Sequence, residues 1–411
     1  MTENPAVPAT PSVHIDFVCQ SSMGQSEGGL ETWAYQFVPG LLRQYPNAIV
    51  HFYGALPIGR PDPSAALLQM VGPDHQRLKL TFFPIRIGRV PQIVSMIRQF
   101  VRYKASANHV QPDIVITAGT FLELLMVRLS RRTRKAFKVT WLRTIWVDQK
   151  TYRIPALIRP LVRKTEAWLL RGADLILGNG SDIAERYSVY GLKVTVIRNA
   201  VDLVRWSAPA PKIASPIRVA FVGRLAIDKG IVEFIEMARR VKSGPLADDF
   251  IFDVYGHSGE EALVAKAADA GILIMHGAVN NEALPAVLAE LDLCVALTKS
   301  DPSRGGGGTS NAMMEQLASG RVMLAWDNMI FRQWLNPDNA YLATQNDVDG
   351  LIKQLYEIRL SPENARRRAA NGHATVSHFG VDAMMNNFDE ALQQAYESYS
   401  KTNPLRPRSR D

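Results

Sequence analysis

The stretch that decides the fold is Arg304–Gly320, R-G-G-G-G-T-S-N-A-M-M-E-Q-L-A-S-G, which follows an apolar run at Leu291–Ala296. Four consecutive glycines cost too much backbone entropy for a helix or strand unless the conformation is needed. The residues after them, Thr309–Asn311, supply N-cap side chains for a helix over Ala312–Ala318. The order of strand, glycine loop and capped helix predicts an anion-binding loop of a parallel sheet, with a flexible surface loop before an ordinary helix as the alternative.

Short, β-branched apolar runs alternate with longer amphipathic runs along the whole chain. This alternation is typical of parallel sheets covered on both faces by helices, and two such sets predict two doubly wound α/β domains. Helical patterns lie, for example, at Leu30–Arg43, Val232–Val241, Glu260–Ala270 and Asn311–Ala318. Strands are expected at Val13–Gln20, Ala48–Phe52, Leu78–Phe83, Asp113–Thr117, Lys138–Leu142, Asp174–Leu177, Lys193–Ile197, Arg218–Val222, Phe250–Tyr255, Ile272–Met275, Leu291–Ala296, Val322–Ala325 and Ala340–Leu342.

A stretch rich in proline and alanine, 203–216, separates the two sets and predicts a linker. We therefore expect an N-terminal Rossmann-like domain over 13–202 and a C-terminal one over 217–378. A long helical pattern over 379–400 would cross back to the N-terminal domain. The two ends, 1–12 and 401–411, are expected to be a disordered lead-in and a basic tail.

The composition fits a soluble globular protein, because 47% of the residues are hydrophobic and 21% are charged. No apolar run is long enough to predict a spanning helix, and the polar N-terminus lacks the features of a secretion signal. Cys19 and Cys294 each lie in an apolar run, which favours buried free thiols in a reducing compartment over a disulfide or a metal site. These observations predict a cytoplasmic protein.

The net charge of +8 is unevenly distributed. Residues 1–205 hold 26 Lys/Arg against 14 Asp/Glu, whereas the remainder holds 21 against 25. A basic half suits an anionic partner, which could be nucleic acid, an anionic membrane surface or a phosphorylated ligand. Because no recognised nucleic-acid motif accompanies the basic residues, we expect no nucleic-acid partner.

The loop after the first strand, Ser21–Glu31, is rich in glycine. Gly24, Gly28 and Gly29 would let the backbone come close to a ligand, and the helix from Leu30 would point amide groups at it. The pattern fits a loop that holds a phosphate or sugar, and it fits a glycine-rich helix cap equally well.

The loop after the first strand of the second half, Phe221–Gly230, carries two cations, Arg224 and Lys229. Arginine offers a planar fork to phosphate oxygens and lysine a mobile point charge. Charge-assisted hydrogen bonds are worth about 1.5–3 kcal/mol each, so the pair could hold a diphosphate against water. A solvated basic loop is the alternative.

Together these motifs resemble those of the family-four retaining glycosyltransferases, which have the GT-B fold. The resemblance covers about Val13 to Phe388 and implies two Rossmann-like domains that face across a cleft. It further implies transfer of a sugar from a nucleotide diphosphate-sugar to a glycan or lipid-linked acceptor with retention, in bacterial-type polysaccharide or glycolipid biosynthesis. Its motifs, in family order, are G-G-L-E at 28–31, A-D-L-I-L-G-N-G-S at 173–181, V-I-R-N-A-V-D at 196–202, V-G-R-L…K-G at 222–230 and G-G-T-S-N-A-M-M-E-Q-L-A-S-G at 307–320.

The resemblance also implies residue roles. Arg224 and Lys229 would hold the donor diphosphate and stabilise the leaving group, while Glu315 would bind the nucleotide ribose. No metal or other cofactor is expected, because the family needs none and the sequence has no clustered ligand set. Further donor contacts would come from Gly28, Gly29, Gly308, Thr309, Ser310 and Asn311.

The sequence departs from the family pattern at two positions. The family usually carries two glutamates with seven residues between them, and the first of these positions holds Gly307 here. It also often carries a histidine where this chain has Arg143. Arg143 could offer a cation to the donor and act in catalysis, and Asp301 or Glu282 could supply the missing carboxylate.

Family members often act on lipid-linked or membrane-proximal acceptors, so the basic first half could contact an anionic membrane surface. The alternative is that the apolar faces are core and the basic faces are merely solvated. One basic set is Arg86, Arg89, Arg98, Arg102 and Lys104, and the other is Arg153, Arg159, Arg163, Lys164 and Arg171, each interleaved with apolar residues.

Other functions fit less well. A non-catalytic, glycosyltransferase-like subunit of a polysaccharide assembly complex is favoured by Gly307 and Arg143. A nucleotide-sugar epimerase remains an alternative within the same fold, whereas a phosphorylase would need a pyridoxal phosphate lysine or a phosphate site that the sequence does not signal. A dehydrogenase is disfavoured, since no G-x-G-x-x-G follows the first strand of either half.

Overall fold

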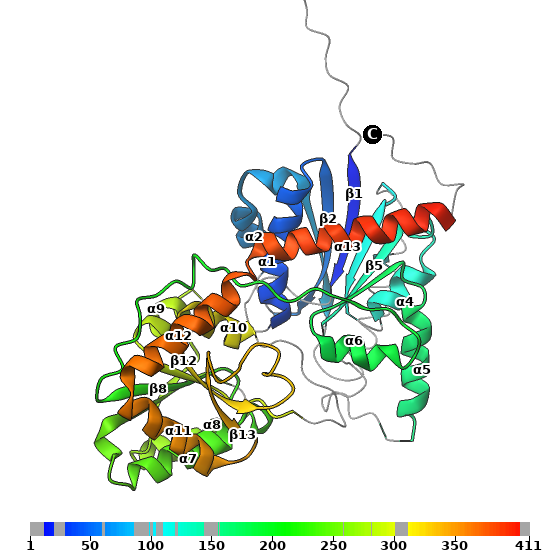
Figure 1. Ribbon diagram of the computed structural model, residues 1–411. Coiled ribbons are helices and arrows are strands. Elements are labelled where there is room, and N and C mark those ends of the chain that lie inside the picture. The colour runs from blue at the N-terminus through cyan, green and yellow to red at the C-terminus, as the bar shows by residue number, and fades with distance from the viewer. Residues whose placement is uncertain are drawn as a thin grey trace, which may run out of the picture. The chain divides into compact units, whose positions relative to one another are not determined.

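The computed structural model describes residues 12–19, 29–59, 62–85, 98, 102–103, 110–119, 122–143, 155, 157–257, 259–280, 282–300 and 311–402. The chain divides into two compact units (Figure 1). Unit 1 lies within Met1–Ile197 and Met384–Asp411, and unit 2 is Arg198–Ala383.

Unit 1 is built on a parallel sheet of seven strands, in the order β3-β2-β1-β4-β5-β6-β7. All its neighbouring strands run parallel, as expected when a helix or a long connection joins successive strands. The strands are β1 (Val13–Cys19), β2 (Ala48–Pro57), β3 (Leu78–Ile85), β4 (Ile114–Ala118), β5 (Phe137–Leu142), β6 (Leu175–Gly178) and β7 (Thr195–Val196).

Aromatic residues fill one face of this sheet, between α1 (Gly29–Gln44) and α13 (Val381–Thr402). Phe388 of α13 stacks on Trp141 of β5 at 5.8 Å between ring centroids and meets Phe37 of α1 edge-on at 5.1 Å. Figure 1 shows α13 lying across this sheet. The C-terminal helix is therefore part of the unit 1 core from Met384 onward.

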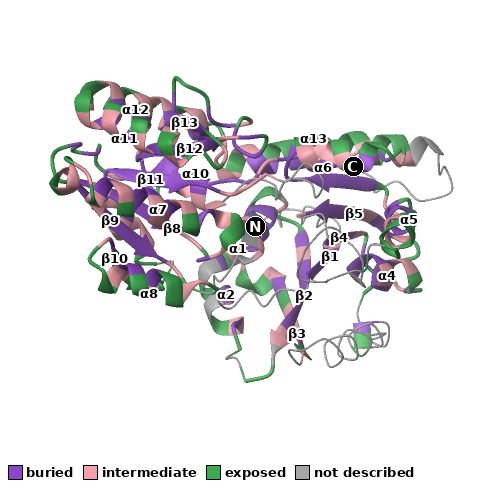
Figure 2. Cartoon of the chain, turned by 90° about the horizontal axis from the view of Figure 1, so that it is seen from below, coloured by how far each residue is buried: buried purple, intermediate pink, exposed green. Residues whose placement is uncertain are grey.

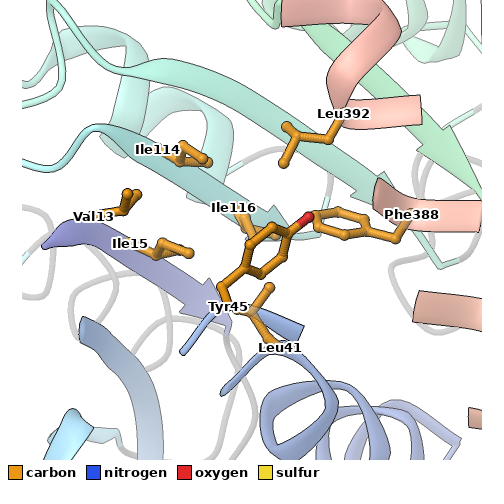
Figure 3. Close-up of a pocket in the computed structure, with 8 residues that line it drawn as sticks. All are labelled: Val13, Ile15, Leu41, Tyr45, Ile114, Ile116, Phe388 and Leu392. Carbon is orange, nitrogen blue, oxygen red and sulfur yellow. The ribbon is translucent and has the colours of Figure 1, made fainter. Parts of the chain in front are cut away.

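A cavity of about 130 Å³ remains between α13 and the amino-terminal part of β1 and β4 (Figure 3). Tyr45 closes one side of it and donates a hydrogen bond from its hydroxyl to Asp389 at 2.6 Å. The rest of the lining is apolar, so the cavity offers packing space and no catalytic group. Its lining residues are Val13, Ile15, Leu41, Tyr45, Ile114, Ile116, Phe388 and Leu392.

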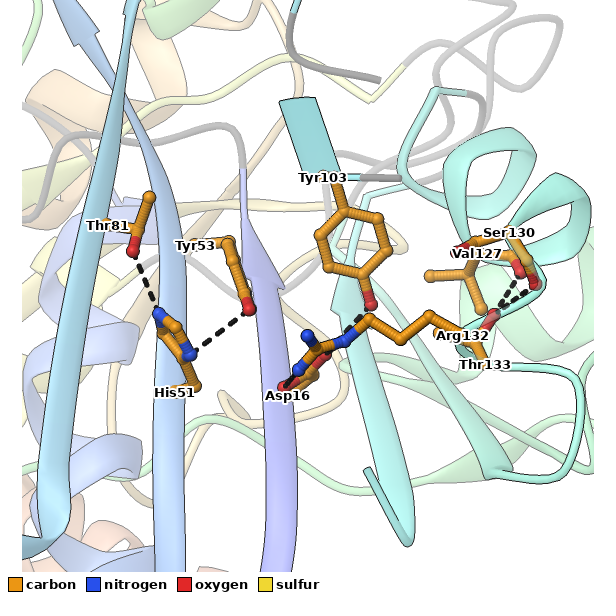
Figure 4. A network of polar contacts seen from close by, with 9 residues as sticks. All are labelled: Asp16, His51, Tyr53, Thr81, Tyr103, Val127, Ser130, Arg132 and Thr133. Atoms are coloured by element: carbon orange, nitrogen blue, oxygen red, sulfur yellow. Dashed lines mark hydrogen bonds and ion pairs between the residues drawn. The ribbon is translucent and has the colours of Figure 1, made fainter. Parts of the chain in front are cut away.

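The opposite face of the sheet carries a buried polar network (Figure 4). Asp16 of β1 accepts hydrogen bonds from Arg132 at 3.1 Å and from the hydroxyl of Tyr103 at 3.0 Å. On β2, the His51 ring bonds to Thr81 and Tyr53. Burial and the Asp16 charge hold the pKa of Tyr103 well above its usual range, so this phenol stays a hydrogen-bond donor to Asp16.

The remaining described helices of unit 1 surround the sheet. In sequence order they are α2 (Ser64–Val71), the 3₁₀ helix η1 (Gly72–Arg77), α4 (Leu122–Leu129), α5 (Arg159–Leu170) and α6 (Ser181–Ser188). The inner residues of α5 and α6, including Leu169, Leu170 and Ile183, pack with Ile176 of β6 in one apolar cluster.

Unit 2 is a parallel sheet of six strands, in the order β10-β9-β8-β11-β12-β13. Its strands and helices share one large apolar core. The strands are β8 (Ile217–Val222), β9 (Phe250–Tyr255), β10 (Ile274–Gly277), β11 (Leu293–Ala296), β12 (Val322–Asp327) and β13 (Tyr341–Thr344). The helices are η4 (Ile227–Lys229), α7 (Ile231–Lys242), η5 (Ala247–Asp249), α8 (Glu261–Asp269), α9 (Leu284–Ala289), α10 (Asn311–Ala318), α11 (Val348–Leu360) and α12 (Pro362–Ser377).

The segment that the sequence suggested as a linker, 203–216, packs on unit 2, and the boundary falls earlier, after Ile197. Trp206 and Ile213 within it are buried, and the buried Arg321 donates a hydrogen bond to the carbonyl of Pro209. The backbone N–H of Ile213 also donates to Asp292 at 3.0 Å. The segment resembles a linker in sequence because it is rich in proline and alanine and contains only a few anchoring side chains.

The predicted architecture of two doubly wound α/β domains is confirmed, and every expected strand is present within a few residues of its predicted bounds. Cys19 and Cys294 are both buried, as expected. Among the described residues, no helix is both long and apolar enough to cross a bilayer. The strands are mostly buried and the helices expose their outer faces (Figure 2).

Candidate active site

The order of the strands locates the ligand-binding edge of unit 2. The chain moves from β8 outward to β10, then returns to place β11 on the other side of β8. Ligands of doubly wound sheets bind outside the carboxyl ends of the strands at such a reversal point. The loops that leave β8 and β11 are therefore the ones to examine, and both were singled out by the sequence.

The loop between β8 and α7 is held in a shape that needs glycine. Gly230 has a left-handed backbone, with φ of +83°, and a Cβ there would lie 2.4 Å from Cβ of Leu297. A Cβ on Gly256, after β9, would lie 1.8 Å from the carbonyl oxygen of Gly223. The three loops after β8, β9 and β11 are thus packed backbone to backbone. This packing fixes the backbone positions from which the side chains of Arg224 and Lys229 extend.

Arg224 and Lys229 lie in this loop without a carboxylate partner among the described residues. Arg224 is exposed, and the half-buried Lys229 makes only a long contact from Nζ to Oγ1 of Thr298, at 3.5 Å. Burial, together with the nearby charge of Arg224, lowers the pKa of Lys229, and Asp228 offsets this only in part. Two neighbouring cations with so few partners form a site that an anion would stabilise.

The loop after β11 is anchored beside these cations. The backbone N–H of Lys299 donates to the carbonyl of Asp228 at 2.8 Å, and Nζ of Lys299 pairs with Glu233 at 2.6 Å. Gln345 accepts from the backbone N–H of Ser300 at 2.7 Å and returns a bond to its carbonyl at 3.1 Å. The chain therefore leaves β11 along a fixed path before it reaches α10.

Glu315 lies one turn inside α10 and makes no side-chain hydrogen bond among the described residues. Burial raises the pKa of this carboxyl to about 8, and the charge of Arg205 opposes the rise. The free protein therefore holds Glu315 mostly neutral at pH 7. Donors such as ribose hydroxyls would stabilise the charged form, which fits the role that the family resemblance implies.

Asn199 is a site residue to which the sequence gave no role. It lies within the V-I-R-N-A-V-D motif, is only 3% exposed, and donates from Nδ2 to Oδ1 of Asn311 at 2.5 Å. Its own Oδ1 is buried without a hydrogen-bond partner. Asn199 thus ties the start of α10 to the first residues of unit 2, and the motif was the signal that could have revealed it.

Arg143 follows β5 in unit 1, and its guanidinium stacks over the ring of Trp33 at 4.4 Å. Its Nε and Nη1 atoms are buried without hydrogen-bond partners. Burial lowers the pKa of Arg143 to about 9, with Cys19 acting in the opposite direction. A buried cation with two atoms that have no hydrogen-bond partner among the described residues is costly to a fold.

Four of the predicted site residues lie in unit 2: Arg224, Lys229, Asn311 and Glu315. Two lie in unit 1, where Gly29 is the first residue of α1 and Arg143 follows β5. Glu282, one alternative carboxylate, is exposed in the loop after β10. The other named positions lie outside the described residues: Gly28, Asp301, Gly307, Gly308, Thr309 and Ser310. Within the described ranges, no group of three His, Cys, Asp or Glu side chains could hold a metal ion.

Sequence models of two glycosyltransferase families match consecutive parts of the chain. Residues 27–205 match Glycosyltransferase Family 4, and residues 205–375 match Glycosyl transferases group 1. Together the two matches support a group 1 glycosyltransferase. The second match contains the loop after β8, α10 and every unit 2 residue named above except Asn199, and the first contains Asn199 and Arg143.

Solved structures with similar folds place this glycosyltransferase in the GT-B class. HepE of Anabaena in complex with UDP gives a TM-score of 0.69 at 15% identity, covering 93% of this chain and 100% of that one. Sucrose-phosphate synthase of Thermosynechococcus elongatus gives 0.73 at 15% identity, covering 94% and 100%.

A curated relative is similar over a shorter stretch. Glycogen synthase of Mycobacterium tuberculosis (strain ATCC 25618 / H37Rv) is 31% identical over 87 residues, which is 20% of this glycosyltransferase. The aligned part spans only 21% of that relative.

Proposed function

We propose that this glycosyltransferase moves a sugar from a nucleoside diphosphate-sugar to a glycan or lipid-linked acceptor, with retention of the anomeric configuration. The observation that carries the proposal is the pair Arg224 and Lys229, which lacks a carboxylate partner at the reversal point of a doubly wound sheet. The similar HepE structure contains UDP, which supports a uridine nucleotide as the first donor to test.

In this proposal Arg224 and Lys229 bind the donor diphosphate. Negative charge grows on the diphosphate as the bond to the sugar breaks, so fixed cations stabilise the transition state more than the ground state. Bound metal ions could do the same for a leaving diphosphate, and the two cations take that role here. The anion would also offset the charge repulsion that lowers the pKa of Lys229.

The nucleoside would be held by α10. Glu315 would accept hydrogen bonds from the ribose hydroxyls, and the N-terminal amides of α10, at Asn311 and the preceding residues Gly308, Thr309 and Ser310, would bind diphosphate or sugar. From unit 1, Gly28 and Gly29 would allow close approach of the chain to the donor, and Arg143 would supply a further cation to it.

The pathway in this proposal is the assembly of a polysaccharide or glycolipid in the cytoplasm, where nucleotide-sugars serve as donors. The family match supports the transferase activity.

Arg143 favours a second candidate, a non-catalytic subunit of a polysaccharide assembly complex. Where the family often carries histidine, this chain has a guanidinium whose Nε and Nη1 are buried and unpaired. A guanidinium stays protonated near neutral pH and cannot exchange a proton as histidine does. Such a subunit would bind a nucleotide-sugar without releasing the sugar.

The experiment is a panel of UDP-, GDP- and ADP-sugars, with thermal stabilisation and release of the nucleoside diphosphate measured for each. We expect at least one donor to raise the melting temperature and to release its nucleoside diphosphate. Arg224→Ala should lower kcat/KM at least about tenfold, because it removes one charge-assisted hydrogen bond. The exposed Lys266→Ala on α8 is the matched control. Stabilisation without release supports the non-catalytic subunit, and no response to any donor refutes both candidates.

Retention is tested separately. Transfer to a simple alcohol acceptor gives a stable glycoside, and proton NMR of its anomeric signal reports the configuration. A product with the configuration opposite to that of the donor would refute retention while leaving the donor site intact.

A further inference from the structure

The outer side of α5 carries large apolar residues that are about half or more exposed. Leu157, just before the helix, is 91% exposed, Leu161 is 67% exposed and Trp168 is 48% exposed. At 100° per residue Leu161 and Trp168 fall on one stripe of the helix, within about 20° of each other, and Leu157 lies just before its first turn. Green, exposed surface along α5 is visible in Figure 2.

Cations share this stripe. Lys164 and Arg171 are exposed and fall beside the apolar residues on the same helical face. The guanidinium of Arg128, from α4, stacks on the Trp168 ring at 3.9 Å and donates to the Trp168 carbonyl at 2.6 Å. We define the α5 surface as Leu157, Leu161, Lys164, Trp168 and Arg171, with Arg128.

From α4 to the end of α5, the described residues expose no acidic side chain. Between residues 122 and 172, the described part of the chain contains two acidic residues, Glu123 and Glu166, and both are buried. The same ranges hold eleven Lys and Arg residues. The surface is therefore apolar and uniformly cationic, and it is complementary to a partner that is both apolar and anionic.

We propose that the α5 surface docks on an anionic lipid bilayer, with α5 lying in the plane of the membrane. Leu157 and Leu161 would enter the acyl boundary, and Trp168 would sit at the headgroup level, where tryptophan is favoured. Lys164, Arg171 and Arg128 would bind lipid phosphates from the same side. The surface spans about 21 Å along the helix, long enough for several headgroups.

The placement of the charges favours a bilayer over a protein partner. Lys164 lies between Leu161 and Trp168, in the middle of the stripe, whereas lysine is depleted from protein interfaces and their cores exclude charge. A long lysine side chain beside leucines suits a lipid boundary, because its stem packs with acyl chains while its ammonium reaches the phosphates. The inference does not depend on the proposed function, since docking needs no sugar donor.

The test is co-sedimentation of the full chain with vesicles of phosphatidylcholine, with or without phosphatidylglycerol. We expect binding to the anionic vesicles that weakens as salt is raised. The double variant Leu157→Gln/Leu161→Gln should weaken binding about tenfold or more, and Lys164→Gln about fivefold. All three side chains are exposed, so the variants should keep the melting temperature of the wild type.

Matched controls lie in unit 2. Val204 is 88% exposed and Leu360 is 82% exposed. The variant Val204→Gln/Leu360→Gln should bind vesicles like the wild type. Lys353→Gln, at an exposed position of α11, serves the same purpose for Lys164→Gln.

A second readout does not rely on loss of binding. Cys19 and Cys294 are buried, so a cysteine introduced by Leu161→Cys can be labelled selectively with an environment-sensitive dye. Its emission should shift to the blue with anionic vesicles, and a label at Leu360→Cys should not respond.

Three outcomes overturn the proposal. The first is equal binding of the α5 and control variants, and the second is an unresponsive label at position 161. The third is a wild-type dimer that Leu157→Gln/Leu161→Gln converts to monomer without any vesicle binding, which would assign the α5 surface to a second copy of the chain.

Discussion

Replacing Lys229 by methionine should lower activity without lowering stability. Methionine keeps the length and apolar stem of lysine, so the half-buried position stays filled. What disappears is a cation whose nearest described polar contact is 3.5 Å away and whose pKa is lowered by burial and by Arg224. In the free enzyme the Lys229 charge therefore destabilises the folded state. Its loss should leave the melting temperature unchanged or raise it.

The loss of catalytic efficiency in Lys229→Met should arise only when the donor is bound. One charge-assisted hydrogen bond to the diphosphate is worth about 1.5–3 kcal/mol, which corresponds to a fall in kcat/KM of about 10- to 150-fold. The assay is initial-rate release of nucleoside diphosphate alongside thermal denaturation, with Lys266→Met as the control on the exposed face of α8. Near-normal kcat/KM in Lys229→Met, or a large loss of stability in that variant alone, would refute the reasoning.

The sign of the pH dependence follows from the lowered pKa of Lys229. Below its folded pKa the lysine is charged in both states, and the folded state bears the full cost of the buried charge. As pH rises through the window between that pKa and the unfolded value of 10.5, the folded state releases its proton first and wild-type stability gains. The stability advantage of Lys229→Met should therefore be largest near neutral pH and shrink toward pH 10.5.

Three further predictions concern other parts of the fold. Because burial raises the pKa of Glu315 from 4.5 to about 8, the wild type should lose stability as pH rises from 4.5 to about 8, and Glu315→Gln should flatten that loss in denaturant titrations at several pH values. Asn199→Ala removes the 2.5 Å bond to Asn311, so the donor KM should rise about two- to tenfold with little change in kcat, and an unchanged KM would contradict a positioning role. Phe388→Ala should destabilise unit 1 by about 3–5 kcal/mol, seen as a lower denaturant midpoint, and a small effect would contradict the packing of α13 on Trp141.

The sequence predicted the strands of both sheets because these depend on apolar periodicity, which is local. It also predicted the loop after β8, where glycines and cations stand close together in the chain. It could not show that Lys229 lacks a carboxylate partner, since that depends on Thr298, Glu233 and the other side chains brought near by β11 and α7.

Two features escaped the sequence for a different reason. The network around Asp16 joins residues from β1, β2, β3 and the turn after α4, and a single aspartate inside an apolar strand was its only local signal. The packing of 203–216 on unit 2 rests on Arg321, more than one hundred residues away. Contacts between distant segments leave no periodic pattern, so only the folded structure reveals them.

The pKa shifts of Lys229 and Glu315 in unit 2 predict that nucleotide binding releases a proton. In the free enzyme, burial and the charge of Arg224 lower the pKa of Lys229, and burial raises the pKa of Glu315. A nucleoside diphosphate would correct both at once, with phosphate beside Lys229 and ribose hydroxyls beside Glu315. Since a carboxyl with a pKa of about 8 is mostly protonated at pH 7, UDP binding should release up to one proton from Glu315. Calorimetry in buffers of different ionisation enthalpy measures this release, and subtracting the value for Glu315→Gln removes the contribution of the nucleotide itself. Equal proton release by the two proteins would mean that Glu315 stays neutral in the complex, which would refute the proposed stabilisation of its charged form by the ribose hydroxyls.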